Sequence, residues 1–99
     1  MMIMTQSKHT IVNFDNCNRI CIERDVPNDV FYISAEIRSP SYGFEILGFY
    51  GDVYDAEAAL LELQAAIKSR EKVFLMPVGS TPLTGRAAEF ARGELLTME

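Results

Sequence analysis

The chain has 99 residues, of which 48% are hydrophobic, and it carries a formal net charge of −5. This length and apolar content predict one globular core that needs no disulfide or metal to hold it together. The acidic balance without any basic run argues against nucleic acid as a partner. No apolar stretch approaches the roughly 20 residues that span a membrane, and the four apolar residues at the start do not resemble a signal peptide. We therefore expect a cytoplasmic protein with no membrane partner.

Four β-strands are predicted in the first half of the chain, at residues 9–14, 19–23, 31–38 and 44–50. Apolar and polar side chains alternate most clearly at 31–38, as in a strand with one buried face. The links between these strands are short and rich in Asn, Asp, Pro and Gly, which favours antiparallel pairing of consecutive strands. The first half therefore predicts an antiparallel four-stranded β-meander.

The second half opens with an amphipathic helix, predicted over residues 53–70. Its apolar side chains recur at helical spacing, at Ala56, Leu60, Leu63 and Ile67. Asp52 and Asp55 both lie where an acidic residue favours the start of a helix, and either can be the N-cap. Together, meander and helix indicate an α+β fold.

The last third of the chain predicts a short fifth strand and a tail. Residues 73–76 are fully apolar and stop at Pro77, which predicts a strand buried on both faces. Residues 83–96 have a weaker helical pattern that ends near Gly93. We expect a domain of meander and helix at 1–77 and a C-terminal extension at 78–99, for which a short docked helix is one interpretation.

A candidate interaction surface follows from this layout, because one helix covers only one face of the predicted sheet. Apolar side chains on the other face require a cover, which the tail, a second copy of the chain or another protein can supply. The residues assigned to this surface are Ile11, Tyr32, Leu47, Phe49, Phe74 and Phe90.

No catalytic, cofactor-binding or metal-binding residue is predicted. Cys17 and Cys21 are placed on one face of a strand about 13 Å apart, too far to share a metal ion or a disulfide. The sole histidine, His9, could approach Cys17 across a turn and form a thiol–imidazole pair, although no motif supports this. The sequence Gly79-Ser80-Thr81 lacks the frame of a phosphate-binding loop.

Several segments between residues 8 and 77 resemble a group of small uncharacterised proteins from Gram-positive bacteria and their phages or mobile elements. The resemblance is carried by residues 10–16 (TIVNFDN), Leu47-Gly48 with Tyr50, the helix with Ala56 and Leu60, and Met76-Pro77. It implies a β-meander followed by a helix and a short strand, in an intracellular protein without an assigned activity. It transfers no functional residue, and the chain departs from the pattern around Asp25–Asp29 and after Pro77.

Three functions are compatible with these observations. The favoured one is a non-catalytic protein-interaction or structural module that associates with itself or with a protein partner. The alternative is a regulator encoded by a mobile element, which binds a host protein or mimics nucleic acid. The third is a small thiol-dependent enzyme that uses His9 and Cys17.

Overall fold

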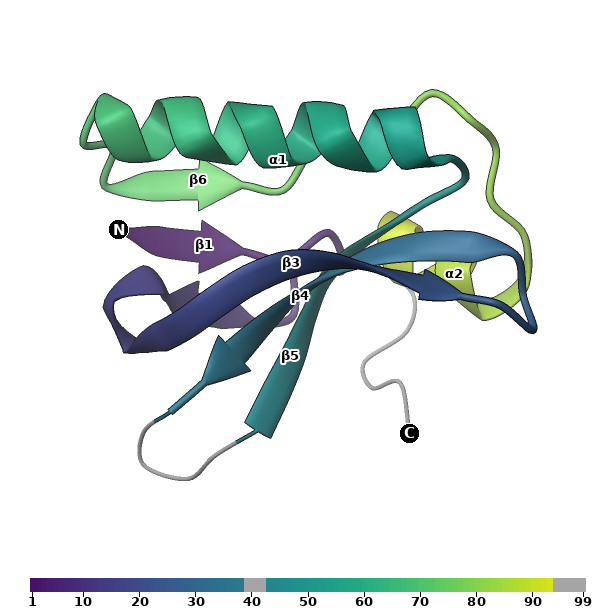
Figure 1. Ribbon diagram of the computed structural model, residues 1–99, viewed down its shortest axis with the longest axis horizontal. Coiled ribbons are helices and arrows are strands. Elements are labelled where there is room, and N and C mark those ends of the chain that lie inside the picture. The colour runs from purple at the N-terminus through teal and green to yellow at the C-terminus, as the bar shows by residue number, and fades with distance from the viewer. Residues whose placement is uncertain (39–42, 94–99) are drawn as a thin grey trace.

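The computed structural model describes residues 1–38 and 43–93 (Figure 1). In chain order the elements are β1 (Met2–Met4), β2 (Ile11–Asn13), the 3-10 turn η1 (Phe14–Asn16), β3 (Cys17–Asp25), β4 (Val30–Ile37), β5 (Gly43–Tyr50), α1 (Val53–Lys68), β6 (Val73–Leu75) and α2 (Gly85–Arg92). The α+β class is confirmed. Within the described ranges, no helix combines the length and the apolar content needed to cross a membrane.

The main sheet is an antiparallel meander of three strands in the order β3-β4-β5. The turn between β3 and β4 closes with a hydrogen bond from the Asp29 amide to the Val26 carbonyl, and Asp29 has a φ of 50°. Aspartate tolerates this left-handed conformation better than most residues, as its place in a predicted turn suggests. The strands expected at 19–23, 31–38 and 44–50 are thus present as neighbours.

The prediction of a four-stranded meander is wrong, because residues 11–13 do not join the main sheet. They pair antiparallel with β1, which places Ile3 opposite Val12, and β1 in turn pairs in parallel with β6. The chain leaves β2 through η1, and β3 begins a separate sheet. A three-residue strand such as β1 is too short to show alternation, so the residue pattern did not reveal β1 as the competing partner.

The short strand at 73–75 exists, but the expectation that both its faces are buried is also wrong. The side chains of Val73 and Leu75 are 63% and 51% exposed, and only Phe74 packs against the core. β6 is an edge strand of the small sheet, so alternate side chains point to solvent. A fully apolar run therefore does not distinguish a central strand from an edge strand here.

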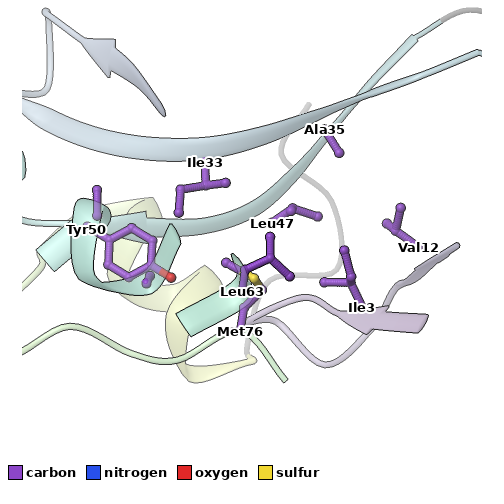
Figure 2. Packing of buried hydrophobic residues seen from close by; sticks show 10 residues of the cluster. Ile3, Val12, Ile33, Ala35, Leu47, Tyr50, Leu63 and Met76 are labelled. Atoms are coloured by element: carbon purple, nitrogen blue, oxygen red, sulfur yellow. The ribbon is translucent and has the colours of Figure 1, made fainter. Parts of the chain in front are cut away.

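One hydrophobic core joins both sheets and α1. Figure 2 shows Ile3 and Val12 from the small sheet in the same cluster as Ile33, Leu47 and Leu63. Helix α1 begins at Asp52, whose carboxylate accepts a hydrogen bond from the Asp55 amide at 2.9 Å, so Asp52 rather than Asp55 is the N-cap. The side chains that α1 buries are Ala56, Ala59, Leu63 and Ala66. The buried face of α1 is thus rotated about the helix axis relative to the prediction, with Ala59 and Ala66 in place of Leu60 and Ile67.

The opposite face of the main sheet is covered in part by α2. The ring of Phe90 meets that of Phe49 edge-on at 5.3 Å, and Ala87 and Val30 complete this smaller cluster. Helix α2 ends at Gly93, whose φ of 77° is the left-handed C-cap that the sequence predicted. The tail therefore supplies one of the three expected covers.

The prediction that Leu47 and Phe49 lie on the same face of the sheet is wrong, because β5 contains a β-bulge. The register with β4 shifts between Ile33 and Ser34, so that Leu47 joins the main core and is fully buried, while Phe49 lies beneath α2. Gly48 sits at this irregularity, consistent with the bulge or close approach that a glycine inside a strand suggests. Alternation alone assigned Leu47 and Phe49 to one face, and the bulge separates them.

Candidate binding groove

The outer edge of β5 is closed at Leu47 and Phe49 by the buried residue Gln6. Its amide Nε2 donates to the carbonyls of Phe49 (3.2 Å) and Pro77 (2.8 Å), and its Oε1 accepts from the Phe49 amide at 2.7 Å. The Gln6 backbone amide also donates to the Leu47 carbonyl at 2.9 Å. A Cβ added at Gly48 would lie 2.7 Å from the Gln6 Cδ, so only glycine fits beneath this side chain. The backbone groups of Leu47 and Phe49 that bond to Gln6 are therefore not available to another strand.

The outer edge of β3 is open by comparison. Within residues 1–38 and 43–93, β3 pairs with β4 alone, so alternate backbone N–H and C=O groups along its nine residues face away from the sheet. Helix α1 does not cover this strand, because it packs mainly against β4 and β5. An unpaired edge of this length is a template for a further strand.

An apolar groove of about 770 Å³ runs between α1 and the open strand; we call it the α1–β3 groove. Its β3 wall, with the adjoining η1, consists of Phe14, Cys17, Asn18, Arg19, Ile20 and Ile22. Its α1 wall consists of Glu57, Leu60, Leu61, Leu63, Gln64 and Ile67. Leu61 is 65% exposed and Ile67 is 38% exposed, whereas Leu63 is buried at the base. Large apolar side chains thus remain in contact with water along an open cleft.

The polar side chains of Asn18 and Arg19, near the groove, interact with Glu36 of the neighbouring strand β4. Glu36 is buried, with 5% of its surface exposed. Its carboxylate accepts a hydrogen bond from the Asn18 side-chain amide and forms an ion pair with Arg19, whose Nε lies 3.5 Å away. This pairing compensates the cost of burying the Glu36 carboxylate. It also fixes the backbone where β3 bulges, between Cys17 and Arg19.

The six residues of the predicted interaction surface do not form one surface, although Tyr32, Phe49 and Phe90 are brought together in the smaller cluster. Leu47, Phe49 and Phe90 are buried within the chain, so they are not available on the surface of a single molecule. Tyr32 is half-buried beside Phe49, with ring centroids 5.9 Å apart. The other two lie on the small sheet, where Phe74 is half-buried and Ile11 is 60% exposed.

His9 and Cys17 are each engaged elsewhere. The His9 Nε2 lies 2.7 Å from the Gly93 carbonyl and helps to hold the end of α2, while the Cys17 thiol donates to the Asn13 carbonyl at 3.6 Å. Burial raises the pKa of the Cys17 thiol, an effect that Arg38 partly offsets. A raised pKa keeps the thiol protonated and weakens it as a nucleophile.

The two cysteines lie on opposite faces of β3, contrary to the prediction that they share one. The bulge between Cys17 and Arg19 turns Cys17 toward the core, whereas Cys21 lies beside Ser34 on the other face. Both are free and half-buried. In the part of the chain that is described, no three His, Cys, Asp or Glu side chains are grouped to hold a metal ion.

Sequence reasoning missed the α1–β3 groove, although the helix carried a signal of it. A core-facing stripe accounts for Ala56, Ala59, Leu63 and Ala66, which leaves a second group of large apolar residues on α1. These are Leu60, Leu61 and Ile67. An apolar face wider than one stripe indicates two contact surfaces on a helix.

Comparison with protein-family models, with curated proteins and with solved structures gives no match for this chain. The resemblance to small proteins of Gram-positive bacteria and their phages therefore stays a prediction.

Proposed function

We propose that the protein is a non-catalytic interaction module that binds an extended strand along the edge of β3. The observation that carries this proposal is an open nine-residue strand beside an apolar groove, in a sheet whose other outer strand is bonded to Gln6 at Leu47 and Phe49. The backbone of the bound strand pairs with β3, and its alternate side chains enter the α1–β3 groove. Main-chain hydrogen bonds then provide affinity and the groove provides specificity.

The shape of the site favours a strand over a small molecule. Small-molecule sites are concave, enclose most of the ligand and present a few converging polar groups. Here the cleft is open along β3, which at nine residues is roughly 30 Å long. In the part of the chain that the structure describes, the regular array of hydrogen-bonding groups beside the cleft is the β3 backbone, which matches another backbone.

The groove also explains why the occupant presents apolar side chains. Leu61 and Ile67 are exposed on one wall, and Ile20 and Ile22 are half-buried on the other. Covering one large apolar side chain completely is worth about 1.5–3 kcal/mol. Two or three such contacts contribute about 3–9 kcal/mol in addition to strand pairing, and the cost of association offsets part of this gain.

The contacts of His9, the only histidine in the sequence, support a non-catalytic function. His9 contacts a backbone carbonyl at the end of α2 rather than Cys17, and burial raises the pKa of the Cys17 thiol by more than Arg38 lowers it. An activated thiol requires an adjacent base or a lowered pKa.

A selection of short random peptides displayed on phage, with the wild-type protein immobilised, tests this proposal. We expect the enriched peptides to alternate apolar with polar residues and to lose binding to the Leu61→Glu variant. Ala58→Glu is the matched control, because Ala58 is exposed on α1 outside the groove and both variants place a carboxylate four residues from an existing glutamate. Equal binding by Leu61→Glu and wild type would exclude the groove as the site.

Amide hydrogen exchange of the protein with and without a selected peptide locates the contact. We expect slower exchange in β3 and in no other strand, because only the β3 edge gains hydrogen bonds. Protection confined to α2 or to the small sheet would contradict the proposal even if the peptide binds.

A further inference from the structure

We infer that the strand bound in the α1–β3 groove is β3 of a second copy of this chain, paired antiparallel about a two-fold axis at Cys21. The inference rests on the proposed function and names its partner. The two main sheets then form one continuous sheet, with both helices α1 on the same side of it, because side chains directly opposite each other in an antiparallel pair share a face.

The sequence of β3 is complementary to itself in this arrangement. Ile20 lies opposite Ile22 of the partner subunit, and Arg19 lies opposite Glu23 of the partner subunit. The two-fold axis repeats each pair, which gives two apolar pairs and two opposite-charge pairs. Cross-strand pairs of both kinds stabilise a sheet.

The two kinds of pair fall on the faces that suit them. Ile20 and Ile22 line the α1–β3 groove. Their pairing with the same residues of a second copy therefore brings apolar side chains to the groove, where Leu61 is exposed. Arg19, which also contributes to the groove wall, and Glu23 alternate with these isoleucines on the other face of β3, and both are exposed. Arg19 meets Glu36 through its Nε, and a guanidinium has five N–H donors, so it can bind a second carboxylate.

Neighbouring registers are less favourable. Centring the pair on Ile20 places Asn18 opposite Ile22 of the partner subunit, and centring it on Ile22 places Arg24 opposite Ile20 of the partner subunit. Each puts a polar side chain against an isoleucine at the groove. Of these three registers, the one centred on Cys21 gives matched pairs on both faces.

Charge also distinguishes this edge from the rest of the molecule. The whole chain carries −5, so two copies repel each other over most of their surface. Strand β3 has two cations, Arg19 and Arg24, against two anions, Glu23 and Asp25, and is neutral. The two-fold pairing uses the β3 edge of each copy, so this contact closes at two chains.

Sedimentation velocity from low to high micromolar concentration tests the pairing. We expect a monomer–dimer equilibrium in which Glu23→Arg raises the dissociation constant about tenfold or more, because Arg19 then faces an arginine twice. The control Glu71→Arg makes the same change of charge at an exposed residue outside the groove and β3, and it should leave the dissociation constant unchanged.

Cys21 reports the register directly. Opposite Cα atoms in antiparallel strands lie about 4.5 or 5.5 Å apart, which is within the range of a disulfide. We expect mild oxidation with diamide to link two chains in the wild type and in Cys17→Ser, but not in Cys21→Ser. Leu61→Glu should reduce the linking, whereas Ala58→Glu should not.

The outcomes separate this inference from the proposed function. A protein that remains monomeric at high micromolar concentration but still binds selected peptides in the groove overturns the pairing alone. A dimer that links through Cys17, or one that Glu23→Arg does not weaken, overturns the register and with it the inference. A protein that neither dimerises nor binds peptides overturns both.

Discussion

The two outer strands of the main sheet, β3 and β5, differ in how their unpaired edges are covered. The edge of β5 is closed at Phe49 by Gln6, a residue near the start of the chain that is 2% exposed. The Gln6 side chain bonds to both the backbone amide and the carbonyl of Phe49. The edge of β3 has no such cover among the described residues, and an apolar groove lies beside it. The edge of β5 at Leu47 and Phe49 is thus part of the interior, whereas the edge of β3 belongs to the surface.

This difference shows two ways to manage the same unpaired backbone. Closing an edge requires a side chain with both a donor and an acceptor, which an amide supplies, together with a glycine such as Gly48 to make room for it. An open edge is protected by charges and bulges, and β3 has four charged residues and a bulge near Asn18. Those devices discourage random association and still permit one matched pairing.

The largest effect is expected at the closed edge, from Gln6→Ala. The substitution leaves the amide and carbonyl of Phe49 without the bonds that Gln6 supplies, and it opens a cavity. We expect the free energy of unfolding to fall by about 2–4 kcal/mol, measured by urea denaturation. Gln64→Ala is the matched control, because Gln64 is exposed beside the open edge, and it should change stability by less than about 0.5 kcal/mol.

The next largest effect tests the close approach at Gly48. In Gly48→Ala the new Cβ lies 2.7 Å from the Gln6 Cδ, so we expect a loss of about 1–3 kcal/mol in thermal or urea unfolding. The same substitution at Gly43, where a Cβ meets nothing within 4 Å, should be neutral or slightly stabilising. The Gly48→Ala cost should shrink in a Gln6→Ala background, and equal costs in both backgrounds would contradict the contact.

A smaller effect is expected from charging the open groove. Leu61→Glu and Ala58→Glu each add a carboxylate four residues from a glutamate on exposed positions of α1. We expect both to lower the free energy of unfolding of the monomer by about 0.3–0.5 kcal/mol. A much larger loss in Leu61→Glu alone, seen in urea titrations at low protein concentration, would mean that the groove belongs to the core of the single chain.

The smallest effect concerns the segment that leads from the closed edge to α2. Asp55 accepts hydrogen bonds from the Thr81 amide at 2.9 Å and the Ser80 hydroxyl at 3.2 Å. Chiefly the Thr81 amide lowers the pKa of Asp55 below its ordinary 3.8. A lowered pKa adds stability above pH 3.8 that is lost as the pH falls through the value in the folded protein.

We therefore expect the stability of the wild type to fall relative to that of Asp55→Asn as the pH decreases from about 5 to about 3. The comparison uses the difference between the two proteins because burial raises the pKa of Glu45, and that shift acts in the opposite direction. Parallel pH profiles for the two proteins would show that Asp55 contributes nothing through its charge.

Much of the local structure could be predicted, and the candidate site could not. Alternation located β4, and the capping aspartate and the left-handed glycine marked the start of α1 and the end of α2. The groove combines η1, β3 and α1, and no single segment contains it. The aromatic residues chosen for a docking surface instead pack with one another, as Phe49 does with Phe90.

The sequence by itself determined the elements other than β1 and η1, because capping, alternation and turn formation depend on residues within a few positions of each other. Only the tertiary structure decided which strands are neighbours, since β2 pairs with β1 rather than β3 and the bulge in β5 separates Leu47 from Phe49. The same holds for the two edges. Gln6 closes β5 from 43 residues away in the chain, and pairing over such a separation depends on the whole packed chain rather than on any local pattern.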